Sequence, residues 1–101
     1  MDNAEANGVL DLIELEAANH SRCKTQAMQA VCASEAISWL SAALESAHGG
    51  CELAGRLRDH HPDAADNLVN RWRDEAARLT VLRHRVVETR RAELAELSGV
   101  A

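Results

Sequence analysis

The sequence lacks the residues that favour β-sheets. Its 101 residues contain no Phe, no Tyr and only two Trp, and they include five Gly and one Pro. Aromatic residues are enriched in strands, whereas the abundant Ala, Leu, Glu and Arg of this chain favour helices. The composition therefore excludes a sheet-rich class and predicts an all-α protein, with one domain spanning residues 1–101.

Glycine and further proline are missing from the last third of the chain. Between Pro62 and Leu97 nothing interrupts a helix, and apolar residues recur three and four positions apart. Such a helix is roughly 52 Å long, whereas a compact domain of this size has a radius of gyration of about 13 Å. We therefore expect an elongated helical hairpin or small helical bundle with a long C-terminal helix. Because the apolar stripe of that helix needs a partner, we also expect a homodimer.

Positive charge is missing from residues 1–21, which contain acids but no Lys or Arg, and the whole chain has a net charge of −5. Neutralisation of phosphates by Lys and Arg supplies most non-specific affinity for nucleic acids, so nucleic acid is a disfavoured partner. One group of cations does lie near the C-terminus: Arg83, Arg85, Arg90 and Arg91. Cations are typical of helix C-terminal ends, and an anion- or nucleic-acid-binding module is the weakest of the functions considered.

The sequence shows neither a secretory signal nor a membrane span. The N-terminus is acidic, and no apolar run of about seven residues follows it. No run approaches the ~20 apolar residues of a membrane-spanning helix. Three cysteines form an odd set, which favours reduced thiols. We expect a cytoplasmic protein that does not associate with membranes.

Three local signals divide the predicted helical chain. The polar residues at 19–21 predict a break, Gly49-Gly50 predicts a helix stop through positive φ, and His61-Pro62 predicts the last helix start. The expected elements are a frayed start at 1–7 and helices at about 8–20, 22–47, 51–59 and 62–97.

The first predicted helix has two apolar faces. At 100° per residue, Leu12 and Leu15 lie about 100° and 160° from Ile13, which belongs to the stripe expected to face the core. Two apolar faces exceed what one core contact needs, and an acidic amphipathic helix can dock in a groove of a partner. We predict that the following residues contact another protein, with the acids steering its approach: Leu10, Leu12, Ile13, Leu15, Glu14 and Glu16.

Apolar positions on the two longer helices predict the core and the dimer seam. On the second helix they cover about half of the circumference, which is wider than the ~100° stripe of an ordinary surface helix. The predicted core and dimer residues are Trp39, Leu40, Leu44, Trp72, Leu79, Leu82 and Val86.

Two His-x-x-Cys pairs are the only pattern that suggests a metal. His20/Cys23 and His48/Cys51 supply a possible zinc set, since each spacing places two ligands on one helix face. The pattern departs from the usual Cys-x₂₋₄-Cys or His-x₃₋₅-His pairs, and a continuous helix would hold the two pairs about 40 Å apart. We therefore expect chance spacing and no metal. Cys23 is predicted to be exposed, and Cys32 is predicted to be buried beside the apolar face.

No catalytic pattern is present. The chain has no Gly-rich phosphate loop, no Ser-His-Asp arrangement and no HExxH motif, so we expect neither an enzyme nor a cofactor. The interpretation that remains is a regulatory protein–protein interaction module, a small helical inhibitor, anti-activator or adaptor of a larger, bacterial regulatory protein. A secretion-type chaperone is one alternative. A metal or redox sensor built on the His-x-x-Cys pairs is the other.

Overall fold

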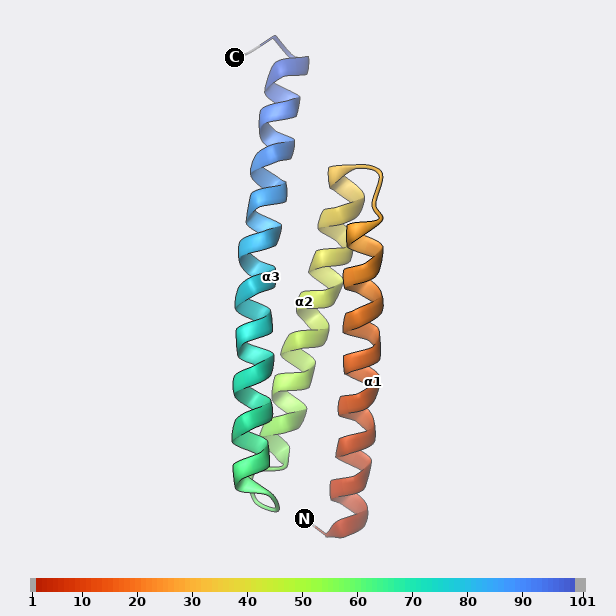
Figure 1. Ribbon diagram of the computed structural model, residues 1–101, viewed down its shortest axis with the longest axis vertical. Coiled ribbons are helices and arrows are strands. Elements are labelled where there is room, and N and C mark those ends of the chain that lie inside the picture. Colours follow the sequence, from red (N-terminus) through yellow and green to blue (C-terminus); the bar gives the residue numbers. More distant parts are fainter. Residues whose placement is uncertain (1, 100–101) are drawn as a thin grey trace.

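The computed structural model describes residues 2–99, which form three helices without a strand among them. Helix α1 spans Asn3–Met28, α2 spans Ala33–Arg56 and α3 spans Pro62–Leu97. The helices run up, down and up, and the molecule measures 62 × 19 × 13 Å (Figure 1). The all-α class and the elongated shape predicted from the sequence are confirmed.

Helix α2 lies between the other two helices and packs on both. No Cα atom of α1 comes within 8 Å of a Cα atom of α3, although both helices approach α2 at this distance. The three helices therefore form an open arrangement rather than a closed bundle. Side chains, not backbones, bridge the space between α1 and α3.

Helix α1 is longer than predicted at both ends. The frayed start at 1–7 is wrong for residues 3–7, because Asp2 caps the helix: its Oδ1 accepts a 2.7 Å hydrogen bond from the backbone N–H of Glu5. The break at 19–21 is also wrong. Asn19 stays helical and donates a 2.6 Å hydrogen bond to Ser46 Oγ on α2. The chain reverses instead at residues 29–32.

Helix α2 continues through Gly49 and Gly50, where a stop was predicted. Neither glycine has a positive φ. A Cβ atom at Gly50 would lie 2.6 Å from Cδ2 of Trp72, so the α2 backbone lies directly against the indole ring. Gly50 permits close packing and does not end the helix. The separate helix predicted at 51–59 is therefore wrong: α2 extends to Arg56 and turns follow at 57–60.

Helix α3 has the predicted bounds. Pro62 occupies its first turn, where the missing N–H of proline costs nothing because that position has no acceptor within the helix. The helix then continues without interruption to Leu97.

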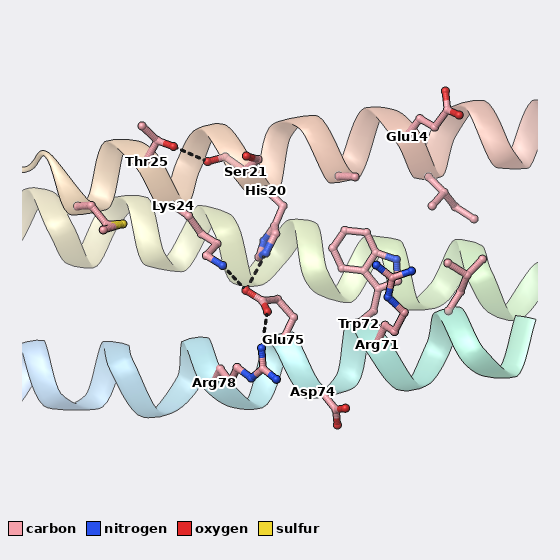
Figure 2. Close-up of a pocket in the computed structure, with 14 residues that line it drawn as sticks. Glu14, His20, Ser21, Lys24, Thr25, Arg71, Trp72, Asp74, Glu75 and Arg78 are labelled. Atoms are coloured by element: carbon pink, nitrogen blue, oxygen red, sulfur yellow. Dashed lines mark hydrogen bonds and ion pairs between the residues drawn. The ribbon is translucent and has the colours of Figure 1, made fainter.

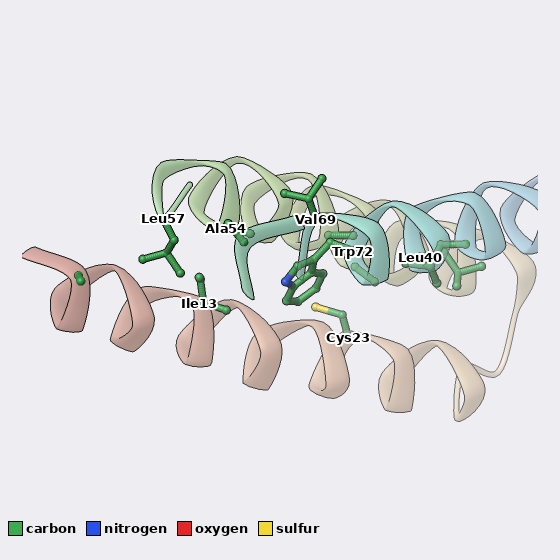
Figure 3. Close-up of a cluster of buried hydrophobic side chains, with 12 residues drawn as sticks. Ile13, Cys23, Leu40, Ala54, Leu57, Val69 and Trp72 are labelled. Atoms are coloured by element: carbon green, nitrogen blue, oxygen red, sulfur yellow. The ribbon is translucent and has the colours of Figure 1, made fainter. Parts of the chain in front are cut away.

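The core is built from small and aliphatic side chains along α2 and its neighbours, with one Trp (Figure 3). Of the predicted core residues, Leu40, Trp72 and Leu79 are buried. Leu82 is not: 43% of its surface is exposed. In Figure 1, the N-terminal half of α2 lies farther from α3 than its C-terminal half does. Trp39, Leu44 and Val86 are half-buried. Among residues 2–99, the buried apolar residues are Ala6, Ile13, Cys23, Leu40, Ala43, Ala47, Ala54, Leu57, Ala65, Val69, Trp72 and Leu79.

The prediction for two of the cysteines is reversed. Cys23 is 2% exposed and packs in the core, whereas Cys32 is exposed in the turn before α2. The reversal follows from the turn at residues 29–32. It removes Cys32 from the apolar face of a helix, and it places Cys23 on the side of α1 that faces α2 (Figure 3).

Candidate functional site

The predicted contact residues of α1 separate into two groups. Ile13 is 7% exposed and belongs to the core, so its assignment to a partner-binding surface is wrong. The three leucines around it remain accessible: Leu10 is 37% exposed, Leu12 46% and Leu15 66%. The intramolecular core therefore uses one face of α1 and leaves the leucines at its margins.

Leu12 and Leu15 share one exposed face. Three residues apart on a helix, they lie about 60° from each other, whereas Leu10 lies about 160° from Leu12. Glu14 is exposed on another side, and Glu16 is half-buried beside α2. Glu16 approaches Gly49, where a Cβ atom would lie 3.3 Å from the Glu16 Cδ. Glu14 is thus the one of the two predicted acids that stays exposed.

A groove of about 750 Å³ runs between α1 and α3. Ile13 and Ala17 of α1 line it from one side, and Leu68 and Trp72 of α3 line it from the other. Figure 2 shows the indole of Trp72 lying between the two helices. The groove is a consequence of the open arrangement. In a closed bundle α1 and α3 would pack against each other, and their side chains would fill this space.

Glu75 joins α1 to α3 in the middle of this groove. Its Oε1 accepts hydrogen bonds from Lys24 Nζ at 2.6 Å and from His20 Nε2 at 3.1 Å, and Arg78 Nη1 lies 3.7 Å from its Oε2 (Figure 2). The hydrogen bond from Lys24 lowers the pKa of the Glu75 carboxyl. Burial opposes this shift, and the hydrogen bond from His20 adds to it. The carboxylate on α3 is therefore held in its charged form by Lys24 and His20 of α1.

His20 connects this cluster to α2. Its Nδ1 lies 3.2 Å from the carbonyl oxygen of Ala43, while its Nε2 contacts Glu75. A neutral imidazole has one N–H and donates to one of these acceptors, whereas the imidazolium donates to both. The His20 ring also meets the Trp72 indole edge-on, with centroids 5.5 Å apart. His20 thus has a structural role that its His-x-x-Cys spacing did not indicate.

The other three residues of the predicted metal set differ in their burial and do not form a metal-binding group with His20. Cys23 is buried in the core, His48 is exposed and Cys51 is half-buried. Across residues 2–99, no three His, Cys, Asp or Glu side chains are grouped so as to hold a metal ion.

A second apolar surface lies at the other end of the molecule. A pocket of about 180 Å³ opens there, and Leu94 and Leu97 are 52% and 85% exposed on the projecting end of α3. The apolar spacing of this helix does not reveal that the α1–α2 hairpin stops short of its C-terminal end (Figure 1). The pocket is lined by Lys24, Ala27, Met28, Ala36, Leu40, Leu82 and Val86.

Two of the four clustered arginines are engaged within the chain. Arg83 Nε donates a 2.9 Å hydrogen bond to Ser41 Oγ, and Arg91 Nη1 lies 3.0 Å from Glu88 Oε1. Arg85 and Arg90 are exposed.

No family model, curated protein or solved structure matches the chain. No helix among the described residues is both long and apolar enough to cross a membrane. The functional argument therefore depends on the exposed surfaces of this chain alone.

Proposed function

We propose that the protein is a non-enzymatic, cytoplasmic regulatory module, a homodimer whose first helix binds a larger protein and acts as its inhibitor or adaptor. The observation that carries the proposal is the exposure of Leu12 and Leu15 side by side on α1. Both residues lie off the stripe that holds α1 on α2.

The energetics of burial support this assignment. Burying one exposed leucine contributes about 1.5–3 kcal/mol, so a paired Leu12–Leu15 contact can anchor a complex. Before Arg22 this helix carries acidic residues but no Lys or Arg. The partner surface that fits it is therefore an apolar groove with basic residues at its rim, which the acids approach by electrostatic attraction.

The proposal is tested by differential capture followed by direct binding. The wild-type protein and a Leu12→Ser/Leu15→Ser variant are used as baits, with Val81→Ser as a control variant that replaces an exposed apolar residue on α3. We expect a partner that the α1 variant loses and the control variant retains. Calorimetry with that purified partner should then show at least a tenfold loss of affinity for the α1 variant. Equal affinity for all three proteins would contradict the proposal.

A further inference from the structure

The end of α3 projects beyond the other two helices (Figure 1). Leu97 lies about 20° from Trp72 around the helix axis, so the apolar stripe that packs on α2 continues into the projecting segment. Leu94 lies about 40° to the other side of Trp72. The apolar stripe of α3 therefore extends beyond the part of the helix that packs on α2.

Other exposed apolar side chains lie where the α1–α2 hairpin closes. Met28 is 85% exposed and Val31 is 93% exposed. Between them and α3 lies the 180 Å³ pocket, in which Val86 of α3 and Leu40 of α2 are wall residues. An apolar occupant fits this pocket best, because among the described residues that line it only Lys24 is charged.

The projecting stripe carries one positive and one negative side chain, so two copies of it can pair opposite charges. Arg90 lies at the same angle as Trp72, in the centre of the stripe, and Glu93 lies about 60° to its side. When two copies of this segment pack in antiparallel orientation, Arg90 of each copy comes opposite Glu93 of the other. The same residues that would be unfavourable facing a purely apolar partner thus form two equivalent ion pairs with a second copy.

We propose that two copies of the protein associate through the projecting ends of α3, packed antiparallel in the register that sets Arg90 opposite Glu93. This inference rests on the proposed dimer and assigns its surface. Four residues along from Glu93, Leu97 of one protomer comes opposite Val86 of the other, at the wall of the apolar pocket. On the other side of the stripe, Val87 of one protomer and Leu94 of the other lie two residues away from being directly opposite each other. Every contact occurs twice, as a two-fold axis requires.

Charge reversal at the two stripe positions tests the register. In the Arg90→Glu variant two acids face each other at both pairs, and in Glu93→Arg two arginines do so. We expect each single variant to dissociate at least about tenfold more readily than the wild type in sedimentation experiments over a concentration series. The two single variants mixed together should regain a dimer, because one chain then carries acids at both positions and the other carries arginines at both. The Arg90→Glu/Glu93→Arg double variant should also recover self-association.

The outer face of the same segment supplies the matched control. Glu88 and Arg91 form an ion pair there, at 3.0 Å, and Glu88→Arg/Arg91→Glu should leave the dimer unchanged. Circular dichroism verifies that all variants keep their helices, which is expected because Arg90 and Glu93 are exposed. A wild-type dimer that neither single reversal weakens would overturn the assigned surface while leaving the dimer intact. A wild-type mass of 11.0 kDa at every concentration would overturn the dimer and this surface together, and would leave partner binding by α1 untouched.

Discussion

The indole ring of Trp72 lies directly on the backbone of α2 at Gly50. A Cβ atom at this glycine would be 2.6 Å from a ring carbon, a separation that real Cβ contacts do not show. Glycine in the interior of α2 lowers helix stability by about 1 kcal/mol relative to alanine. It also allows α2 and α3 to pack in close contact. The same Trp72 receives the edge of His20 from α1, so this position joins all three helices.

The Gly50→Ala variant is expected to destabilise the protein despite the better helix propensity of alanine. The indole must move from its place between the helices, and overpacking of this kind costs about 1–3 kcal/mol. Thermal unfolding measures the effect. Gly8→Ala and Gly55→Ala are matched controls, because a Cβ atom at either position meets nothing within 4 Å. Both controls should stabilise the protein by up to about 1 kcal/mol, and an equal gain at Gly50 would contradict the packing assignment.

The Glu75→Gln variant is expected to lose about 1–2 kcal/mol of stability at neutral pH, because Lys24 and His20 lose their charged acceptor. Asp74→Asn changes the neighbouring acid, which is exposed, and should be nearly neutral. Urea denaturation of the three proteins provides the comparison. Equal stability of the two variants would show that the Glu75 cluster is not stabilising.

The same cluster predicts a dependence of stability on pH. The pKa of Glu75 is lower in the folded protein than in the unfolded chain, so its carboxylate contributes stability above the unfolded pKa of about 4.3. This contribution is lost as the pH falls through the folded pKa. Between about pH 6 and pH 3 the melting temperature of the wild type should therefore fall more than that of Glu75→Gln. Parallel curves would contradict a lowered pKa at this site.

The same substitution by serine is predicted to destabilise the protein strongly at Ile13 and very little at Leu15. Ile13→Ser removes a buried side chain and should cost about 2–5 kcal/mol. Leu15→Ser alters a side chain that is 66% exposed and should change the stability by no more than about 0.5 kcal/mol. Chemical denaturation distinguishes the two. A large loss at Leu15 would mean that its face serves the fold and is not reserved for a partner.

The three thiols are predicted to react in the order Cys32, Cys51, Cys23. Cys32 is exposed and Cys51 half-buried, whereas Cys23 is enclosed by the core, and a thiol reagent reaches it only when the helices open. Alkylation followed by peptide mass spectrometry gives the order under native conditions. Early modification of Cys23 would contradict its burial.

The sequence predicted the features that depend on local periodicity. The bounds of α3 follow from Pro62 and from the absence of any later interruption, and they are confirmed. Local signals failed where a tertiary contact outweighed them. Gly50 has the conformational freedom to end a helix. It stays helical in α2, where the absence of a Cβ atom lets the ring of Trp72 pack against its backbone. Asn19 can interrupt a helix, but Ser46 on α2 satisfies its amide.

For the candidate sites, too, the sequence predicted what local spacing determines and missed what tertiary contacts determine. Angular spacing identified Leu12 and Leu15 as lying off the core stripe, and both are exposed. It also assigned Leu82 to the core and dimer seam, although Leu82 is 43% exposed, because the spacing of apolar residues on one helix does not show how far the neighbouring helix stays in contact with it. The Glu75 cluster was not predicted either. Its hydrogen bonds from Lys24 and His20 to Glu75 join residues 51 and 55 positions apart, and no local pattern links them.

The central position of α2 also has a consequence for how the chain folds. Every helix packs on the helix next to it in sequence, so each native pairing closes only the short connection at residues 29–32 or 57–61. The entropy lost on closing such short loops is small. Helical proteins dominated by such local contacts fold within microseconds to milliseconds. We therefore expect either hairpin, α1–α2 or α2–α3, to be able to form first, with the third helix packing on it afterwards.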